Sequence, residues 1–335
     1  QAGSVVIKAK GNYGFTQVTR TFDIGKRYIE VKADDKSSRV GKNLEPLTYT
    51  CVTTGLPYEG DNFTGALATN AVKDTVGTYQ ITQGTLLLGD NYNIDFKLGT
   101  YTVQDKLSQD NFKFTGVEDG KVTKTYGDAD FTFEATGKVE DSKEVLYFSS
   151  EPTVATVGSD GKVHILSTGT TTIKATASAT DDYAQGVATY ELTVNAKTLT
   201  KADLTYSGPI TKGYDGSTNA PSGLTVSVNP SSLVNDDTLD ITGSAVYNSK
   251  DVKDANTITF TPNAITTGNY RLSAAEVLTI TGASITAKEV TLTSGINATD
   301  RSYVKDNKAV DLTKGTLVFT GLVSGETLDV NIPAT

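Results

Sequence analysis

The strongest constraint in this sequence is a short pattern that occurs four times: polar turn residues, then a tyrosine, then an alternating, strand-like segment. The copies are Gly11-Asn12-Tyr13, Asp90-Asn91-Tyr92, Asp181-Asp182-Tyr183 and Gly268-Asn269-Tyr270. Repeats at such intervals are typical of small domains in series, each with a core of its own. A chain of 335 residues with this pattern is not expected to fold around one large core.

A second recurring element marks where domains begin. Lys124-Thr125-Tyr126-Gly127-Asp128, Lys212-Gly213-Tyr214-Asp215-Gly216 and Arg301-Ser302-Tyr303 each follow a short strand-like segment. Residues 3–10 also recur as residues 169–176, and residues 22–24 as residues 192–194. Residues 1–25 are therefore predicted to be the last two strands of a truncated domain, which bury too little apolar surface to fold alone.

Alternation of apolar and polar residues, rich in Thr, Val, Ile and Tyr, predicts strands over most of the chain. Examples are residues 170–177, 187–194, 277–285 and 316–319. No segment shows a sustained helical periodicity, and residues 61–70 are the one place where the pattern allows a short helix. The pattern predicts an all-β fold of small β-sandwich (Ig-like) and related β-rich repeat domains in tandem. Short linkers without Gly/Ser tracts predict that these domains form an extended, monomeric rod.

Composition excludes several classes of function. The chain has 39 acidic and 30 basic residues, a net charge of −9, which disfavours nucleic acids and anionic membranes as partners. No apolar run approaches the roughly 18 residues that span a bilayer, so direct membrane insertion is not expected. The single histidine, His164, and the single cysteine, Cys51, disfavour histidine-based metal sites and dithiol chemistry.

Three stretches carry resemblances to known families. Residues 149–157, 161–163 and 169–173, with an opening at residues 124–131, resemble a bacterial immunoglobulin-like domain of the group 2 type. Residues 44–50, 65–67, 76–79 and 90–94 resemble the MBG repeats of bacterial surface proteins. Residues 214–218, 249–252 and 268–270 resemble the YDG repeat. A further YDG-type repeat is expected from residue 289, although Tyr303-Val304-Lys305 stands where Tyr-Asp-Gly is expected.

The resemblances divide the chain into five parts. We expect the truncated Ig-like domain at residues 1–25, an MBG-type domain at 26–104, a group 2 Ig-like domain at 105–196, a YDG-type domain at 197–288 and the start of a further YDG-type repeat at 289–335.

What these resemblances imply is a non-enzymatic stalk or adhesin segment of a bacterial protein that is secreted or exposed on the cell surface. Two alternatives stay open. One is a module that binds host or microbial surface glycans or proteins, and the other is an accessory region of a secreted polysaccharide-degrading enzyme. Fold-level resemblance alone does not locate a binding site.

No enzyme is expected, because the sequence holds no nucleophile elbow, Walker loop, dinucleotide fingerprint or zincin motif. His164 alternates with Val163 and Ile165, so it is predicted to be exposed on a strand without a nucleophile beside it. Cys51 shares the apolar face of Tyr49 and is predicted to be a buried, inert thiol.

Two sets of candidate ligand residues remain. Asp181 and Asp182 are the candidates for calcium, which needs several convergent oxygen ligands, whereas the alternative is that they cap a turn. No other cofactor is expected. Tyr58 and Phe63, beside Gly60-Asp61, are candidate ligand-stacking aromatics. The recurring tyrosines Tyr13, Tyr92, Tyr183 and Tyr270 are interpreted instead as tyrosine corners, with packed rings and hydroxyls bonded to nearby backbone.

Overall fold

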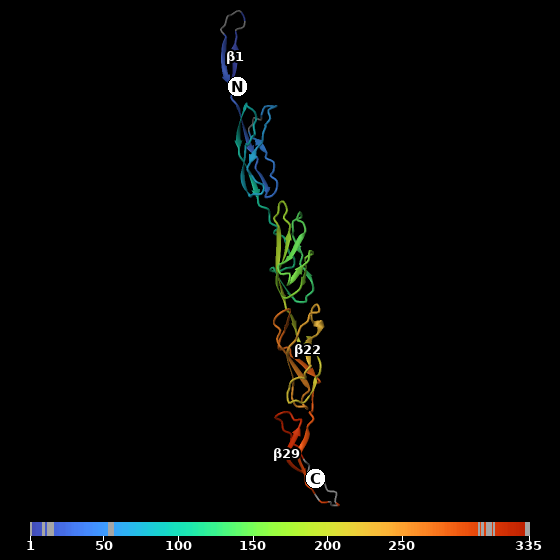
Figure 1. Ribbon diagram of the computed structural model, residues 1–335. Coiled ribbons are helices and arrows are strands. Elements are labelled where there is room, and N and C mark those ends of the chain that lie inside the picture. The colour runs from blue at the N-terminus through green and yellow to red at the C-terminus, as the bar shows by residue number, and fades with distance from the viewer. Residues whose placement is uncertain are drawn as a thin grey trace. The chain divides into compact units, whose positions relative to one another are not determined.

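The computed structural model of the chain (Figure 1) describes residues 2–8, 11, 17–52, 57–300, 302, 305, 310 and 312–331. Almost all its regular structure is strand, which confirms the all-β prediction; the helices among these residues are the 3-10 turns η1 (Lys201–Asp203) and η2 (Pro230–Ser232). The chain forms two compact units, residues 1–116, 133–148 and 174–189, and residues 117–132, 149–173 and 190–335. The predicted rod and the domain boundaries stay predictions.

In the first unit, the predicted pair of strands at the N-terminal end is present. Ala2 lies opposite Asp23 and Ile7 opposite Val18 in an antiparallel hairpin. Residues 26–104 follow with two sheets of order β5-β3-β8 and β4-β9-β7-β6. The strands are β1 (Ala2–Ile7), β2 (Val18–Asp23), β3 (Arg27–Ala33), β4 (Lys36–Arg39), β5 (Tyr49–Cys51), β6 (Ala68–Thr69), β7 (Gly77–Thr82), β8 (Tyr92–Lys97) and β9 (Gly99–Gln104).

Two clusters form the core of residues 26–104. Alternate residues of β3, namely Ile29, Val31 and Ala33, are fully buried, as the period of two residues in a strand requires. Ile29 and Val31 pack in one cluster with Leu86, Leu88 and Tyr92, and Ala33 packs in the other with Ile81, Tyr101 and Val103.

The short helix that the sequence allowed around residues 61–70 does not form. Thr64 and Leu87 form an antiparallel bridge instead, and β6 follows. Gly65 has φ +79°, and a Cβ there would lie 2.0 Å from the carbonyl oxygen of Thr85. The segment is therefore held against residues 85–87 by an isolated bridge and a close backbone contact that local periodicity does not encode.

Residues 105–196 contain a four-stranded sheet of order β11-β18-β17-β14, a three-stranded sheet of order β12-β16-β15 and the pair β10-β13. The strands predicted at 170–177 and 187–194 are confirmed as β17 and β18. β11 runs parallel to the end of β18, with Thr125 opposite Asn195. The strands are β10 (Lys113–Phe114), β11 (Lys121–Thr125), β12 (Phe131–Thr132), β13 (Ala135–Thr136), β14 (Val145–Ser149), β15 (Ala155–Val157), β16 (Lys162–Ile165), β17 (Gly169–Ala177) and β18 (Gly186–Asn195).

Residues 197–288 form small sheets of order β19-β25, β20-β22, β21-β27 and β23-β24-β26. The strand predicted at 277–285 is in fact two strands, because Gly282 between them has φ +77° and turns the chain. The strands are β19 (Lys197–Leu199), β20 (Leu204–Ser207), β21 (Thr211–Gly213), β22 (Thr225–Val228), β23 (Gly243–Tyr247), β24 (Thr257–Pro262), β25 (Tyr270–Leu272), β26 (Leu278–Thr281) and β27 (Ser284–Thr286).

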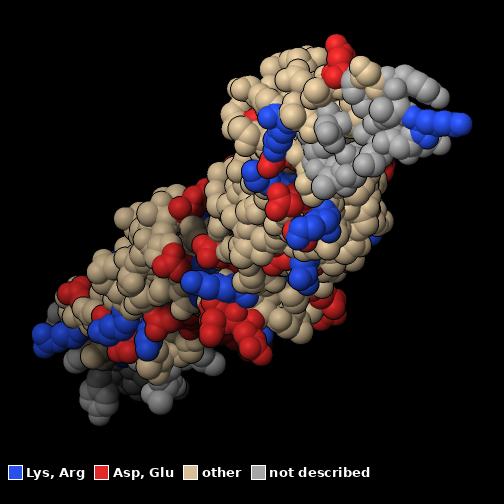
Figure 2. All heavy atoms as spheres, turned by 90° about the horizontal axis from the view of Figure 1, so that it is seen from below, with Lys and Arg blue, Asp and Glu red and all other residues tan. Residues whose placement is uncertain are grey.

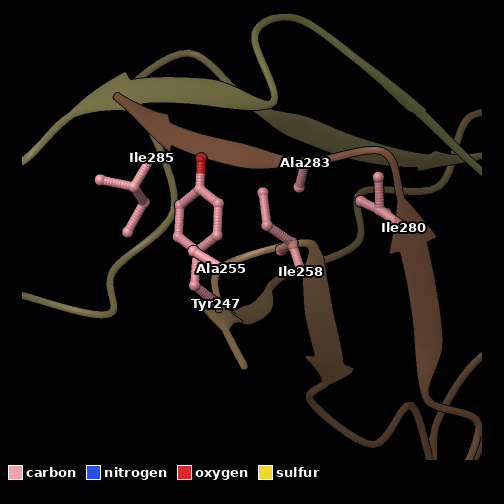
Figure 3. Packing of buried hydrophobic residues seen from close by; sticks show 6 residues of the cluster. All are labelled: Tyr247, Ala255, Ile258, Ile280, Ala283 and Ile285. Carbon is pink, nitrogen blue, oxygen red and sulfur yellow. The ribbon is translucent and has the colours of Figure 1, made fainter. Parts of the chain in front are cut away.

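The core of this segment is built around Tyr247. Figure 3 shows its ring among Ile258, Ile285 and small alanine side chains. The buried hydroxyl donates to the backbone carbonyls of Ile210, at 2.9 Å, or Ser284, at 3.0 Å. A large polar-tipped side chain can fill a core in this way only because its hydroxyl finds a partner.

The remaining described residues form an antiparallel pair, β28 (Thr291–Ala298) and β29 (Leu312–Thr320), with irregular register near Ser294. The predicted strand at 316–319 lies in β29, which confirms it. The opening predicted at Tyr303 lies outside the described residues.

Charge is mixed over the surface. Figure 2 shows basic and acidic side chains side by side on the face it draws. Within the described part of the chain, the structure has no helix with the length and apolarity to cross a bilayer.

Candidate functional site

The Tyr-Asp-Gly loop after β21 is organised by a nearly buried lysine. The Lys212 side chain is 10% exposed, and its Nζ donates to Oδ1 of Asp215 at 2.7 Å and to the carbonyl oxygen and Oγ of Ser217 at 3.1 and 3.0 Å. Asp215 also accepts from the backbone N–H of Ser217 at 2.9 Å. The three acceptors replace the water molecules that the ammonium group loses on burial. The aspartate of the motif holds the turn in place through its bond to the Ser217 N–H.

We expect this loop to make stability depend on acid pH. The Lys212 ammonium, followed by the Ser217 N–H, lowers the pKa of Asp215 to about 2. Because the folded pKa lies below the unfolded value of about 3.9, the contribution of Asp215 is present above about pH 4 and is lost as the pH falls toward 2. Asp215→Asn should therefore lower the urea midpoint at neutral pH, and the difference should shrink between pH 4 and 2. Asp240→Asn, an exposed carboxylate of the same segment, is the control, and a difference that persists unchanged at pH 2 would contradict the assignment.

The tyrosine and the glycine of the motif face a different part of the chain. The Tyr214 hydroxyl donates to the carboxylate of Glu326, and a Cβ at Gly216, which has φ +80°, would lie 2.9 Å from Cγ1 of Val323. Tyr214 also donates its backbone N–H to Thr286, the last residue of β27. Tyr214 and Gly216 thus lie at the end of their own segment and contact the turn at residues 323–326 in the next one.

The same arrangement occurs at the end of residues 105–196. Tyr126 donates its N–H to Asn195, the last residue of β18, and its hydroxyl donates to Oδ2 of Asp237 at 2.9 Å. Asp237 also accepts from the Tyr270 hydroxyl at 2.8 Å, and the two tyrosine rings meet edge to face with centroids 5.7 Å apart. A Cβ at Gly127 would lie 2.5 Å from Cγ2 of Val234. We call this set of contacts the Asp237 joint.

The tyrosines of the Asp237 joint are removed from water. Tyr126 and Tyr270 are each 5% exposed. Burial, and then the carboxylate of Asp237, raise the pKa of Tyr126, and burial raises the pKa of Tyr270 to about 12. Both hydroxyls therefore stay protonated as donors, and one carboxylate accepts from two segments at once.

Two of the recurring tyrosines have the structural role that was predicted, a packed ring and a hydroxyl bonded to backbone, but their backbone partners lie 36 and 34 residues earlier and not within a few residues as in a tyrosine corner. Tyr270 packs in the joint, and its hydroxyl accepts from the backbone N–H of Val234 at 2.8 Å. Tyr92 is buried, and its hydroxyl accepts from the N–H of Tyr58 at 3.2 Å and donates to Oδ2 of Asp61 at 2.5 Å. Tyr183 is half-buried in a parallel bridge with Leu107, and Tyr13 lies outside the described residues.

The structure separates the two candidate ligand aromatics. Tyr58 is 68% exposed, and the Arg27 guanidinium lies 4.7 Å from its ring centre. Phe63 is half-buried, packs against the core cluster of Ile29 and meets Tyr49 edge to face at 5.1 Å. A ligand surface here would rest on Tyr58, because the Phe63 ring contributes to the core.

The candidate calcium residues lie beside a lysine. Nζ of Lys42 is 3.1 Å from Oδ1 of Asp182, with both side chains partly exposed, whereas Asp181 is exposed. Across the described residues, no group of three or more His, Cys, Asp or Glu side chains converges as a metal site would require. The Lys42 ammonium already compensates the charge of Asp182, so a calcium site at this turn stays a prediction that gains no ligand from its surroundings.

The single histidine and the single cysteine lie in ordinary strand positions. His164 is half exposed, as predicted, and its Nδ1 lies 2.6 Å from Oδ1 of Asp130. His164 and then Lys162 lower the pKa of Asp130. Sequence reasoning did not connect Asp130 with His164, although the neighbour of Asp130, Phe131, pairs with Val163 across β12 and β16. Cys51 is free and half-buried rather than fully buried, because β5 lies at the edge of its sheet.

Three family models match this chain. They are the MBG domain (YGX type) over residues 29–102, the bacterial Ig-like domain (group 2) over residues 124–188 and the YDG domain over residues 195–277. These families are the ones that the motifs indicated, so that identification is confirmed. A search of curated proteins gives no match.

Several solved structures have some similarity to this chain. A SusE-like, surface-located polysaccharide-binding protein from the heparin utilisation locus of Bacteroides thetaiotaomicron is 10% identical, with a TM-score of 0.23 over 58% of this chain and 38% of that one. The protocadherin gamma B4 extracellular domain is 11% identical, with a TM-score of 0.28 over 83% and 53%. An S-layer protein is 13% identical, with a TM-score of 0.20 over 98% and 56%. This chain thus spans about half or less of these proteins' lengths.

Proposed function

We propose that this chain, which carries an MBG domain, a group 2 bacterial Ig-like domain and a YDG domain, is a non-enzymatic structural spacer, a stalk of a secreted or surface-exposed bacterial protein. The observation that carries the proposal is the Asp237 joint. A spacer has to transmit position from one domain to the next, and this joint ties two domain-sized segments together through buried, fully bonded groups.

The backbone around the joint leaves little slack. Lys197, which follows β18 after one residue, donates its N–H to the carbonyl of Asn269 at 2.9 Å and pairs with Tyr270 in the parallel register of β19 and β25. Thr168 donates its N–H to Oδ1 of Asn269 at 3.0 Å. The link between residues 105–196 and residues 197–288 is therefore strand β19, which is paired with β25. The loop at Thr168 in residues 105–196 is also bonded to Asn269, next to this pairing.

The non-enzymatic part of the proposal is supported by the partners of the histidine and of the most buried lysine–aspartate pair described above. The one histidine is exposed and is paired with Asp130 and, through it, with Lys162. A catalytic triad needs an aligned nucleophile in addition to such a pair. Lys212 and Asp215 satisfy each other inside a turn, which is a structural arrangement.

Adhesion belongs to the finer part of the proposal, in which the stalk extends or itself mediates contact with host or microbial surface glycans or proteins. The chain is proposed to act outside the cell. Tyr58 is the exposed aromatic that would take part in a glycan-binding alternative, because sugar rings stack on exposed aromatic faces; an accessory region of a secreted polysaccharide-degrading enzyme is the other alternative.

Two measurements on the whole chain test the spacer. A compact globule of 335 residues has a radius of gyration of about 20 Å, and we expect small-angle scattering to give at least about twice that value. A chain that is a spacer only gives no saturable binding to glycan arrays, mucin or matrix proteins, with or without calcium. A radius near the compact value would contradict the stalk. Saturable binding that Tyr58→Ala abolishes would favour the glycan- or protein-binding module, and binding that requires calcium would point to the Asp181-Asp182 turn.

A further inference from the structure

A pocket of about 740 Å³ lies where residues 24–27 enter the MBG-type segment. Tyr58, Asp61 and Tyr92 line it together with Gly25 and Arg27. Asp61 accepts from the Tyr92 hydroxyl, and its N–H donates to the carbonyl of Tyr58 at 2.9 Å, so residues 58–61 form a turn that ends in a carboxylate.

This pocket reproduces half of the Asp237 joint bond for bond. In the joint, residues 234–237 form the same turn: Asp237 donates its N–H to the Val234 carbonyl at 2.9 Å, and the Val234 N–H and Asp237 carboxylate both bond the Tyr270 hydroxyl. The entering strands also agree. Arg27 pairs with Tyr92 and donates to the Asn91 carbonyl, as Lys197 pairs with Tyr270 and donates to the Asn269 carbonyl, both at 2.9 Å.

At the Asp237 joint the remaining place is filled by Tyr126 from the preceding segment. The turn at residues 323–326 likewise ends in a carboxylate, and Glu326 accepts from Tyr214. In both cases the tyrosine donates its N–H to the last residue of its own segment's final strand. The partner of such a carboxylate is thus set by position: it is the side chain directly after the strand that pairs in parallel with the final strand of the preceding segment.

The junction between residues 26–104 and residues 105–196 has neither the tyrosine nor the turn carboxylate. Val40 donates its N–H to Gln104 at the end of β9, so it stands where Tyr126 and Tyr214 stand in their segments. The corresponding turn of the next segment, in which Ser142 donates its N–H to Val139, ends in a serine whose hydroxyl donates to the Ser178 carbonyl. Tyrosine and carboxylate therefore occur together at two junctions and are replaced together at the third, which indicates that the carboxylate serves the incoming tyrosine.

We propose that the pocket at Tyr58, Asp61 and Tyr92 is a docking site for the Tyr-Gly loop of another β-domain of this kind, with Asp61 accepting the tyrosine hydroxyl. The proposal deepens the spacer function and rests on it. The pocket would thus be half of a joint. It would receive a domain that has tyrosine, and not valine, directly after the strand paired in parallel with its final strand.

The test uses the chain's own tyrosine loop. Residues 27–196, carrying Cys51→Ala, are joined in front of residues 27–335, so that Tyr126 of the added copy has the position that the joint geometry requires at Asp61. The Cys51 that remains is the only thiol, and β5, where it lies, pairs with β3 beside the pocket. Its rate of reaction with a disulfide reagent under native conditions reports the opening of this segment.

We expect Tyr126→Phe in the added copy to raise the rate of thiol reaction about tenfold, the equivalent of one hydrogen bond to a charged acceptor. Asp61→Asn should have a similar effect, and the two together should add little to either. Asp90→Asn, at another carboxylate lining the pocket, should leave the rate unchanged.

Equal rates with and without Tyr126→Phe in the added copy would overturn the docking site. The spacer function is checked separately in the same molecule by Tyr126→Phe in the second copy. This substitution should loosen the Asp237 joint and so reduce the hydrogen-exchange protection of the Lys197 amide. If Tyr126→Phe in the second copy loosens the Asp237 joint but Tyr126→Phe in the added copy leaves the Cys51 rate unchanged, only the docking site fails. If neither substitution has an effect, the docking site and the spacer function both fail. Protection of Cys51 in the unextended chain by a soluble glycan, lost with Asp61→Asn, would also overturn it and assign the pocket to a sugar.

Discussion

Replacing Asp237 with alanine is expected to lower the free energy of unfolding of the YDG-type segment by about 2–4 kcal/mol, since a buried donor that loses a charged partner costs about 1–3 kcal/mol. Two such donors are affected, because the hydroxyls of Tyr126 and Tyr270, both 5% exposed, share this carboxylate at 2.9 and 2.8 Å. Of the two, Tyr270 keeps the backbone N–H of Val234 as a bond to its oxygen, but that bond leaves its own proton without an acceptor.

Native-state hydrogen exchange is the suitable measurement, because a chain of several domains does not unfold in two states. The amide of Lys197, bonded to the Asn269 carbonyl, should lose protection in Asp237→Ala. Asp236→Asn is the matched control: it removes one charge at the next position, and asparagine tolerates the φ of +60° found there. Equal protection in Asp237→Ala and Asp236→Asn would show that the joint does not hold the segments together.

The recurring tyrosine motifs could be found in the sequence, whereas what they bind could not. Tyr126 and Asp237 are 111 residues apart, and Tyr214 and Glu326 are 112 apart. The acceptor lies in each case in a turn of the following segment, and turns are rich in Asp for local reasons as well. A carboxylate that serves another domain therefore looks, in a single sequence, like any other turn residue.

The strand predictions succeeded where alternation alone decides the structure. β17 and β18 bury alternate side chains such as Ile173, Ala175, Tyr190 and Leu192, so the period of two is visible in the sequence. Prediction failed where a backbone glycine or non-local pairing decides. Gly65 and Gly282 have positive φ. Gly65 bends a segment for which the sequence left a short helix open, and Gly282 divides a segment predicted to be a single strand.

The candidate ligand residues show the same limit. Tyr58 and Phe63 are close in sequence, yet one is exposed beside Arg27 and the other packs on Tyr49. The sequence did not show which of the two side chains would be buried. Their segment forms no strand with a visible period of two, because Thr64 pairs with Leu87 only in an isolated bridge. Asp182 was singled out for its acidic neighbour, but its partner is Lys42, 140 residues earlier.

If the chain is a series of separately stabilised domains, damage to one core should stay within it. Ile258 is completely buried beside Tyr247 and Ile280 (Figure 3), and Ile258→Ala should lower the unfolding free energy of the YDG-type segment by about 2–5 kcal/mol through lost burial and the cavity left behind.

The same substitution should leave the reaction rate of Cys51 unchanged, because the clusters around Ile29 and Ala33 share no residue with the cluster around Ile258. Native-state hydrogen exchange of the amides in the YDG-type segment, together with the thiol reactivity of Cys51, measures both effects. Val246→Ala is the control: Val246 is 38% exposed on β23, and an exposed substitution usually changes stability by less than about 0.5 kcal/mol. A faster reaction of Cys51 in Ile258→Ala would mean that the segments unfold together, which a stalk of independent domains does not allow.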